Sequence, residues 1–227
     1  MSLKLALLPV IGPQALLARR RARILPEPPG ARAGRAGSGP PLRLLIAGDS
    51  SAAGVGCAVQ DQALSGRLAA RLSGRFDLSW QVAARTGAVT AQVPDLIGGG
   101  PWDVAVLSIG LNDVTRGTPI GRWLVQRAAL FERLAPARLV VSGLPPLGAF
   151  PALPQPLRWV MGRELARYEA AGRAQAEALG HRFAPLIGIT DDVSLMAEDG
   201  FHPGPAVYDM WADLLVPRVV EAAAQAA

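Results

Sequence analysis

The chain has 227 residues, half of them hydrophobic, which is enough for one domain with a substantial core and excludes a wholly disordered polymer. A single cysteine excludes a disulfide scaffold, and two histidines leave little material for a closed zinc site. Of the net charge of +5, residues 1–43 contribute +7 and the rest −2, which disfavours nucleic-acid binding because such a domain needs a basic folded body.

Residues 3–18 form an apolar stretch that is followed at once by the basic sequence RRRAR. The stretch is too short to span a membrane, which takes about 20 apolar residues, and Pro13 interrupts it. Arginines directly behind the apolar residues are unusual for a signal peptide, so we expect a cytoplasmic or peripherally membrane-associated protein rather than a secreted one. Two interpretations stay open: residues 3–23 contact a membrane, or they form a helix that packs against the body or a partner chain.

Residues 26–41 are rich in Pro, Gly, Arg and Ala and offer little to bury. Such a composition is typical of a linker. The sequence therefore divides into an N-terminal extension with its linker, residues 1–39, and one folded domain, residues 40–227.

The folded domain shows short apolar segments that alternate with helical patterns. Strands are predicted at residues 42–48, 77–84, 102–110, 138–143 and 181–186. Helical spacing of apolar residues is found at residues 59–72, 119–134, 157–168 and 205–219. This alternation predicts the α/β class, a three-layer α/β/α sandwich around a five-stranded parallel sheet. In such sheets a ligand site lies beyond the carboxyl ends of the strands.

Polar residues and glycines follow several of these strands. Ser50 comes after the first strand, Gly87 after the second, Asn112 after the third, and Asp199 and His202 after the fifth. Hydrolysis by a serine needs a base, a group that orients the base, and donors that face the oxyanion. Each residue also has a purely structural interpretation, because Ser caps helices and Asn and Asp form turns. Their joint occurrence favours a catalytic site.

His202 is the better candidate for the base. Asp199 precedes it by three residues, so the carboxylate can reach the far imidazole nitrogen. The other histidine, His181, stands between a predicted helix and a strand with no carboxylate beside it in the sequence.

Four motifs together resemble the SGNH-hydrolase superfamily, also called the GDSL esterases and lipases. They are Gly48-Asp49-Ser50 with the stretch to Gly54, the glycine Gly87, Gly110-Leu111-Asn112-Asp113, and the segment from Asp199 to Pro203. The resemblance covers roughly residues 42–220 and implies a flavodoxin-like sheet. It implies that Ser50 is the nucleophile, His202 the base and Asp199 its orienting group.

The same resemblance implies an oxyanion hole formed by the Ser50 N–H, the Gly87 N–H and the Asn112 side chain. The chain departs from the family at one position, where Ser51 replaces the leucine that follows the nucleophile. Ser51 is therefore a rival nucleophile, although the alignment of the motif favours Ser50.

The sequence thus predicts a serine esterase that acts through an acyl-enzyme and requires no cofactor or metal. The expected substrate is a small-molecule or lipid ester with a short to medium acyl chain, because no long insertion is present to form a large lid. Leu144, Leu147, Phe150 and Phe201 are candidates for the substrate pocket, although the segment around residue 150 could equally be an ordinary loop over the core.

Other activities remain open. An acyltransferase, a lysophospholipase or a thioesterase could use the same residues. A different class, a non-enzymatic flavodoxin-like module, would hold a phosphate or flavin in the turn between Gly48 and Gly56. The spacing of the glycines and the lack of a lysine in that turn disfavour it.

Overall fold

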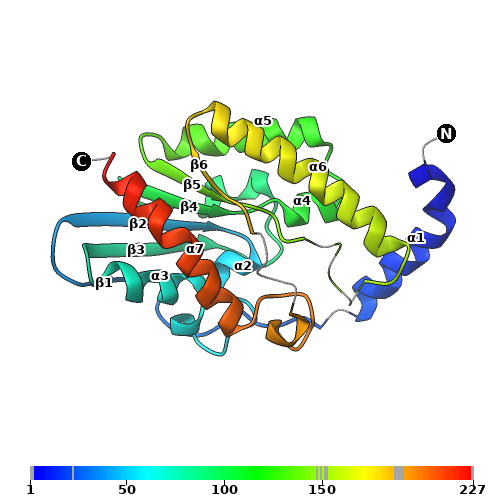
Figure 1. Cartoon of the computed structure of the whole chain (residues 1–227), viewed down its shortest axis with the longest axis horizontal. Helices are drawn as coiled ribbons and strands as arrows, with labels where there is room; N and C mark the ends of the chain where they lie inside the picture. The colour runs from blue at the N-terminus through cyan, green and yellow to red at the C-terminus, as the bar shows by residue number, and fades with distance from the viewer. Residues whose placement is uncertain are drawn as a thin grey trace.

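The computed structural model describes residues 3–21, 23–146, 148, 150, 153–186 and 192–225. The strands are β1 (Ala33–Ala36), β2 (Pro41–Gly48), β3 (Asp77–Ala84), β4 (Val104–Ser108), β5 (Arg138–Ser142) and β6 (Arg182–Ala184). The α-helices are α1 (Leu3–Arg21), α2 (Ser50–Ala53), α3 (Leu64–Leu72), α4 (Leu111–Thr115), α5 (Ile120–Leu134), α6 (Leu157–Ala178) and α7 (Pro205–Ala223). Helices cover both faces of one central sheet (Figure 1), which confirms the predicted α/β sandwich.

The alternation of side chains along β2 explains the three layers. Leu44 and Ile46 face a core that they share with α3 and α7. Leu45 and Ala47 face the opposite core, which they share with α5 and α6. Because both faces of the strand are buried, β2 is a continuous apolar run, as expected for a central parallel strand.

The strand order is β1-β3-β2-β4-β5-β6, and β2 to β6 are parallel. The strands β3 and β4 pair with opposite edges of β2. The chain therefore passes from β2 to β3 on one side of β2 and later adds β4 on the other side. This is the topological switch point at which open α/β sheets bind ligands, and it places the end of β2 at the centre of the candidate site.

The prediction of a five-stranded, fully parallel sheet is wrong in one respect. A sixth strand, β1, lies antiparallel against β3 at the edge of the sheet. It falls within residues 26–41, so the interpretation of that whole stretch as a linker is also wrong. An edge strand pairs through its backbone and needs few apolar side chains, and Gly34 leaves room for the Trp80 ring against it.

The segment that precedes β1 is held by polar contacts. The carboxylate of Glu27 accepts hydrogen bonds from the backbone N–H and the hydroxyl of Thr86, at 2.7 and 2.8 Å. It also pairs with Arg32, whose guanidinium donates to the carbonyl of Ala84. These bonds attach residues 27–32 to the end of β3, a role that composition alone does not indicate.

Helix α1 packs against α6 (Figure 1). Ile11 is buried between Leu157 and Val160 of α6. The side chain of Gln14 donates to the carbonyl of Gln155 at 2.7 Å and accepts from the N–H of Leu157 at 3.1 Å. One face of α1 is therefore a helix packed on the body. No helix in the described part of the chain is long and apolar enough to cross a membrane.

Candidate active site

Ser50 is the first residue of α2 and stands directly beyond β2. The turn between them is tight: a Cβ on Gly48 would lie 1.9 Å from the carbonyl oxygen of Ser108, so only glycine fits there. Asp49 caps α2 by accepting a hydrogen bond from the N–H of Ser51 at 3.1 Å. The strand thus delivers Ser50 to the switch point in a fixed position.

The structure brings the three predicted catalytic residues into one chain of contacts. The Nε2 atom of His202 lies 2.9 Å from the hydroxyl oxygen of Ser50. Its Nδ1 atom lies 2.6 Å from Oδ2 of Asp199. It is the hydroxyl of Ser50, rather than that of Ser51, that meets the imidazole, so the geometry selects between the two rival serines.

The other oxygen of Asp199 accepts hydrogen bonds from the backbone N–H groups of Phe201 and His202, each at 2.9 Å. Burial of the Asp199 carboxyl opposes its ionisation, but the hydrogen bonds from His202 and Phe201 outweigh burial and lower the pKa of Asp199. The carboxylate is therefore ionised at neutral pH and suited to hold the imidazole in one tautomer.

The loop that carries Asp199 and His202 is closed on itself. Ala197 N–H donates to the carbonyl of His202 at 2.9 Å, and Gly204 N–H donates to the carbonyl of Leu195 at 3.1 Å. The loop also lies close to the turn after α2, where a Cβ on Gly56 would come within 2.2 Å of the Pro203 carbonyl oxygen. Gly56 has a φ of +101°, which favours glycine for a second reason.

Asn112 lies in α4, which begins directly after Gly110 at the end of β4. Its amide nitrogen donates to the carbonyl of Ala88 at 3.0 Å and lies 3.5 Å from Oδ2 of Asp49. The second contact is long for a hydrogen bond. Gly87, with a φ of +75°, stands beside it in the loop after β3, and its carbonyl accepts a hydrogen bond from Arg116 at 2.6 Å. Asn112 thus lies at the end of β2, and Gly87 directly precedes Ala88, to which the Asn112 amide donates.

A buried polar network lies behind Asn112 that sequence reasoning missed. Asp113 is fully buried and accepts hydrogen bonds from the N–H and hydroxyl of Thr90, at 2.9 and 2.8 Å. The hydroxyl of Thr90 in turn accepts from the indole N–H of Trp123 at 3.1 Å. This network connects the loop after β3 to α4 and α5 and so fixes the relative positions of the predicted oxyanion donors.

Two carboxyls of the site are shifted toward their neutral form. Burial raises the pKa of Asp49 to about 7, the hydrogen bond from Ser51 N–H opposes this, and the nearby Asp113 carboxyl adds to the increase. Burial likewise raises the pKa of Asp113. No signal in the sequence indicates that the pKa values of these two aspartates shift in the opposite direction from that of Asp199.

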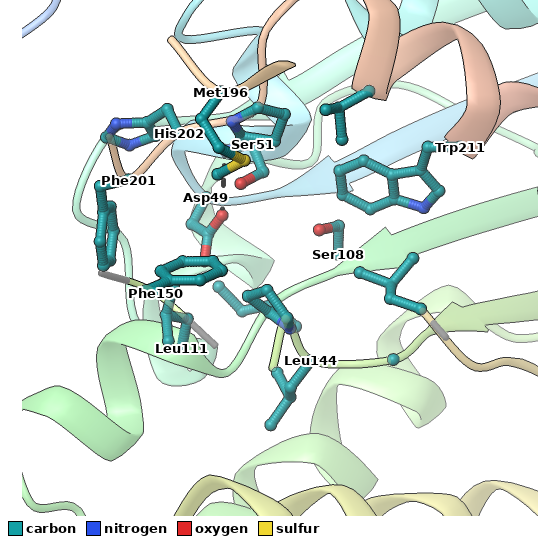
Figure 2. Close-up of a pocket in the computed structure, with 16 residues that line it drawn as sticks. Asp49, Ser51, Ser108, Leu111, Leu144, Phe150, Met196, Phe201, His202 and Trp211 are labelled. Atoms are coloured by element: carbon teal, nitrogen blue, oxygen red, sulfur yellow. Dashed lines mark hydrogen bonds between the residues drawn. The ribbon is translucent and has the colours of Figure 1, made fainter. Parts of the chain in front are cut away.

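An apolar pocket adjoins His202 (Figure 2). Its space measures about 560 Å³ when the solvent at its mouth is included. The predicted pocket residues Leu144, Phe150 and Phe201 line it, and Leu147 lies outside the described residues. The rings of Phe150 and Phe201 meet edge to face, with centroids 5.8 Å apart. Three of the four residues predicted to line a substrate pocket thus line this cavity.

Other parts of the pocket wall come from residues that sequence reasoning did not assign to it. Trp211 and Val207 of α7, Leu186 and Met196 contribute (Figure 2). The indole N–H of Trp211 donates to the hydroxyl of Ser142 at 3.0 Å, which fixes the ring at the base of the pocket. The helical spacing of the apolar residues in α7 identifies the buried face of that helix. It does not indicate which end of the face lines a cavity.

His181 lies at the start of β6, where its ring packs edge-on against Phe131 with centroids 4.8 Å apart. It is therefore a packing residue at the opposite end of the strands from His202. Within the described ranges, no three His, Cys, Asp or Glu side chains gather as a metal site requires.

The chain matches one protein family over most of its folded domain. Residues 46–210 match the model of the GDSL-like lipase/acylhydrolase family. The chain belongs to this family. The match covers most of the folded domain, from β2 into α7, and includes every residue of the contact chain between Ser50, His202 and Asp199.

One curated GDSL-like protein is similar over most of the chain. A GDSL-like esterase of Mycobacterium tuberculosis is 35% identical over 190 residues, which are 77% of this chain and 60% of that protein. The chain thus spans about 60% of the length of that curated relative.

Solved structures share the fold at low sequence identity. A lipase/acylhydrolase of Enterococcus faecalis is 17% identical with a TM-score of 0.62, over 78% of this chain and 95% of that one. The psychrotrophic esterase EstA of a Pseudoalteromonas species, solved with monoethylphosphonate as inhibitor, is 18% identical with a TM-score of 0.61. The match covers 79% of this chain and 97% of that one.

Proposed function

We propose that this protein is a serine esterase in which Ser50 is the nucleophile, His202 the general base and Asp199 the orienting carboxylate. The observation that carries the proposal is the unbroken chain of contacts from Ser50 Oγ through both imidazole nitrogens to Asp199. The phosphate- or flavin-binding alternative gives no role to this chain of contacts.

Acylation begins when the imidazole of His202 accepts the proton of the Ser50 hydroxyl and the oxygen attacks the ester carbonyl. The ionised Asp199 stabilises the imidazolium that forms. The carbonyl oxygen becomes an oxyanion, which is held by the N–H groups of Ser50 and Gly87 and by the amide of Asn112. One amide hydrogen of Asn112 is engaged by Ala88, and the long contact to Asp49 leaves the other available.

The intermediate collapses when the imidazolium of His202 protonates the leaving alcohol and the carbon–oxygen bond to that alcohol breaks. Water then enters, gives its proton to the same imidazole and attacks the acyl-enzyme. Release of the acid returns the Ser50 hydroxyl. An alcohol in place of water would give a new ester, so hydrolysis and acyl transfer differ only in the acceptor.

The pocket supports an acyl chain of short to medium length. Its walls are apolar side chains such as Leu144 and Phe150, which would bury an acyl chain at roughly 0.8 kcal/mol for each methylene. Trp211, fixed by Ser142, closes the inner end and would limit that length.

The test is a series of p-nitrophenyl esters of increasing acyl length, hydrolysed by the native chain and by Ser50→Ala and Ser51→Ala prepared identically. We expect Ser50→Ala to lose turnover by several orders of magnitude and Ser51→Ala to retain most of it. The chain length of fastest turnover sizes the pocket. Equal rates for the native chain and Ser50→Ala would refute the proposal, because background cleavage would then explain both.

A further inference from the structure

Helix α1 is apolar on more than one side, although only one side is packed against the body. Its docked face comprises Leu7, Ile11, Gln14 and Ala18, which recur every three or four residues and meet α6 and its preceding loop. This spacing matches one side of an α-helix. Every residue of α1 whose burial the structure describes is exposed if it lies outside this docked face.

The outward face of α1 includes the exposed side chains of Leu8, Val10, Leu16 and Leu17. Ile24, just beyond the helix, is 93% exposed. These five account for nearly half of the exposed large hydrophobic residues in the described part of the chain. A helix that is apolar all round is normally enclosed by protein or by a membrane. We therefore expect this face to be covered by a further binding partner.

The charge pattern indicates which partner. Residues 1–26 contain no Asp or Glu, but they contain Lys4 and four arginines, at positions 19, 20, 21 and 23. Arg20 is exposed, and Arg23 pairs with the exposed carboxylate of Glu198 at 2.9 Å. Apolar side chains flanked by arginines complement the two layers of an anionic bilayer surface, acyl chains and headgroup phosphates. A second copy of the chain would cover the leucines but supply no counter-charge from its own α1.

We propose that the outward face of α1 lies in the interfacial region of an anionic bilayer, with its leucines among the acyl chains and Arg20 at the headgroups. The docked face keeps its contacts with α6, so the helix binds along the membrane surface and does not cross it. This binding is separate from ester hydrolysis and stands or fails independently of it.

The docked position of α1 brings such a membrane close to the candidate pocket. Leu153 and Met161 pack both against the cluster around Ile11 and against the cluster that contains Phe150 and Phe201. The pair of Arg23 with Glu198 also stands next to Asp199 in the chain. Membrane binding through α1 would therefore hold the pocket near esters that reside in the bilayer.

The experiment is sedimentation of the full-length chain with vesicles of phosphatidylcholine alone or mixed with phosphatidylglycerol. We expect binding to the mixed vesicles, weak binding to phosphatidylcholine, and release from the mixed vesicles at high salt. Leu16→Asp should weaken binding at least about tenfold, because it places a charge in the inserted face. Leu179→Asp is the matched control, since Leu16 and Leu179 are each 53% exposed, and it should bind as the native chain does.

Hydrolysis of a soluble p-nitrophenyl ester and the thermal unfolding midpoint are measured on the same preparations. Both should be unchanged in Leu16→Asp, which separates loss of lipid binding from loss of fold or activity. The proposal is overturned if the native chain ignores anionic vesicles, or if Leu16→Asp and Leu179→Asp bind equally. It is also overturned if the native chain is a dimer in solution that Leu16→Asp converts to a monomer, because a second copy would then cover this face.

Discussion

The candidate site has two halves, and the pKa values of their carboxyl groups are shifted in opposite directions. The sheet half comprises residues directly after β2 and β4, including Asp49 and Asn112, and the loop half comprises residues 196–204. In the sheet half, Asp49 is buried with one close donor, the Ser51 N–H, and its pKa is raised to about 7. In the loop half, Asp199 accepts from one imidazole and two backbone N–H groups, and its pKa is lowered.

Burial opposes the ionisation of both carboxyls, and only at Asp199 do the donated hydrogen bonds outweigh it. Ionised Asp199 can stabilise a developing imidazolium. Asp49, near its titration midpoint at neutral pH, instead caps α2 and borders the Asn112 amide. In the proposed mechanism the ionised carboxylate therefore lies in the loop half, and the sheet half supplies fixed dipoles.

Asp199→Asn is the change that should separate the halves most strongly. It removes the charge while keeping the side-chain size, and an amide stabilises the wrong imidazole tautomer. We expect kcat to fall on the order of 10⁴-fold. Asp192→Asn is the control and should retain activity. Asp192 precedes the same loop and accepts a hydrogen bond from the N–H of Ser194. Retention of a tenth or more of the activity by Asp199→Asn would break the assignment of charge to the loop half.

Asn112→Ala tests the dipoles of the sheet half. Loss of one oxyanion donor should lower kcat by about 10²–10³-fold with little change in KM, because the amide acts on the oxyanion and not on the ground state. The measurement is steady-state kinetics on one p-nitrophenyl ester, with Thr115→Ala on the same helix as control. A change mainly in KM would indicate that Asn112 binds substrate and does not stabilise the transition state.

Asp49→Asn tests the raised pKa of the sheet half through stability. The folded state binds the Asp49 proton more tightly than the unfolded state does, so this stabilising contribution is full below about pH 3.8 and is lost as pH rises through about 7. Asparagine does not ionise. The free energy of unfolding of Asp49→Asn relative to the native chain should therefore increase between about pH 4 and about pH 8, by at most about 4 kcal/mol. Urea unfolding at both pH values measures this, and a difference independent of pH would contradict the raised pKa.

The sequence predicted most of what the sheet determines. The five parallel strands were predictable because strands buried on both faces are continuous apolar runs, as in residues 42–48. The convergence of Ser50 and Asn112 followed from the common edge of parallel strands. The relation of Asp199 to His202 followed from a separation of three residues.

The rest depends on contacts that no local pattern encodes. Strand β1 pairs through backbone groups in an Ala-Gly-Arg-Ala segment that lacks strand propensity. The pocket wall at Trp211 is determined by which turn of α7 meets the cavity. The raised pKa of Asp49 is determined by its burial and by how few donors reach it, and three-dimensional packing sets both.

The most direct test of the central claim, that Ser50 is the nucleophile activated by the loop half, is covalent labelling with a fluorophosphonate. Attack by an activated serine displaces fluoride and leaves a phosphonyl group on Oγ, which peptide mass spectrometry locates. We predict a single label on Ser50, absent in Ser50→Ala, retained in Ser51→Ala and formed much more slowly in Asp199→Asn. A label on Ser51, or equal labelling of the native chain and Asp199→Asn, would contradict the account.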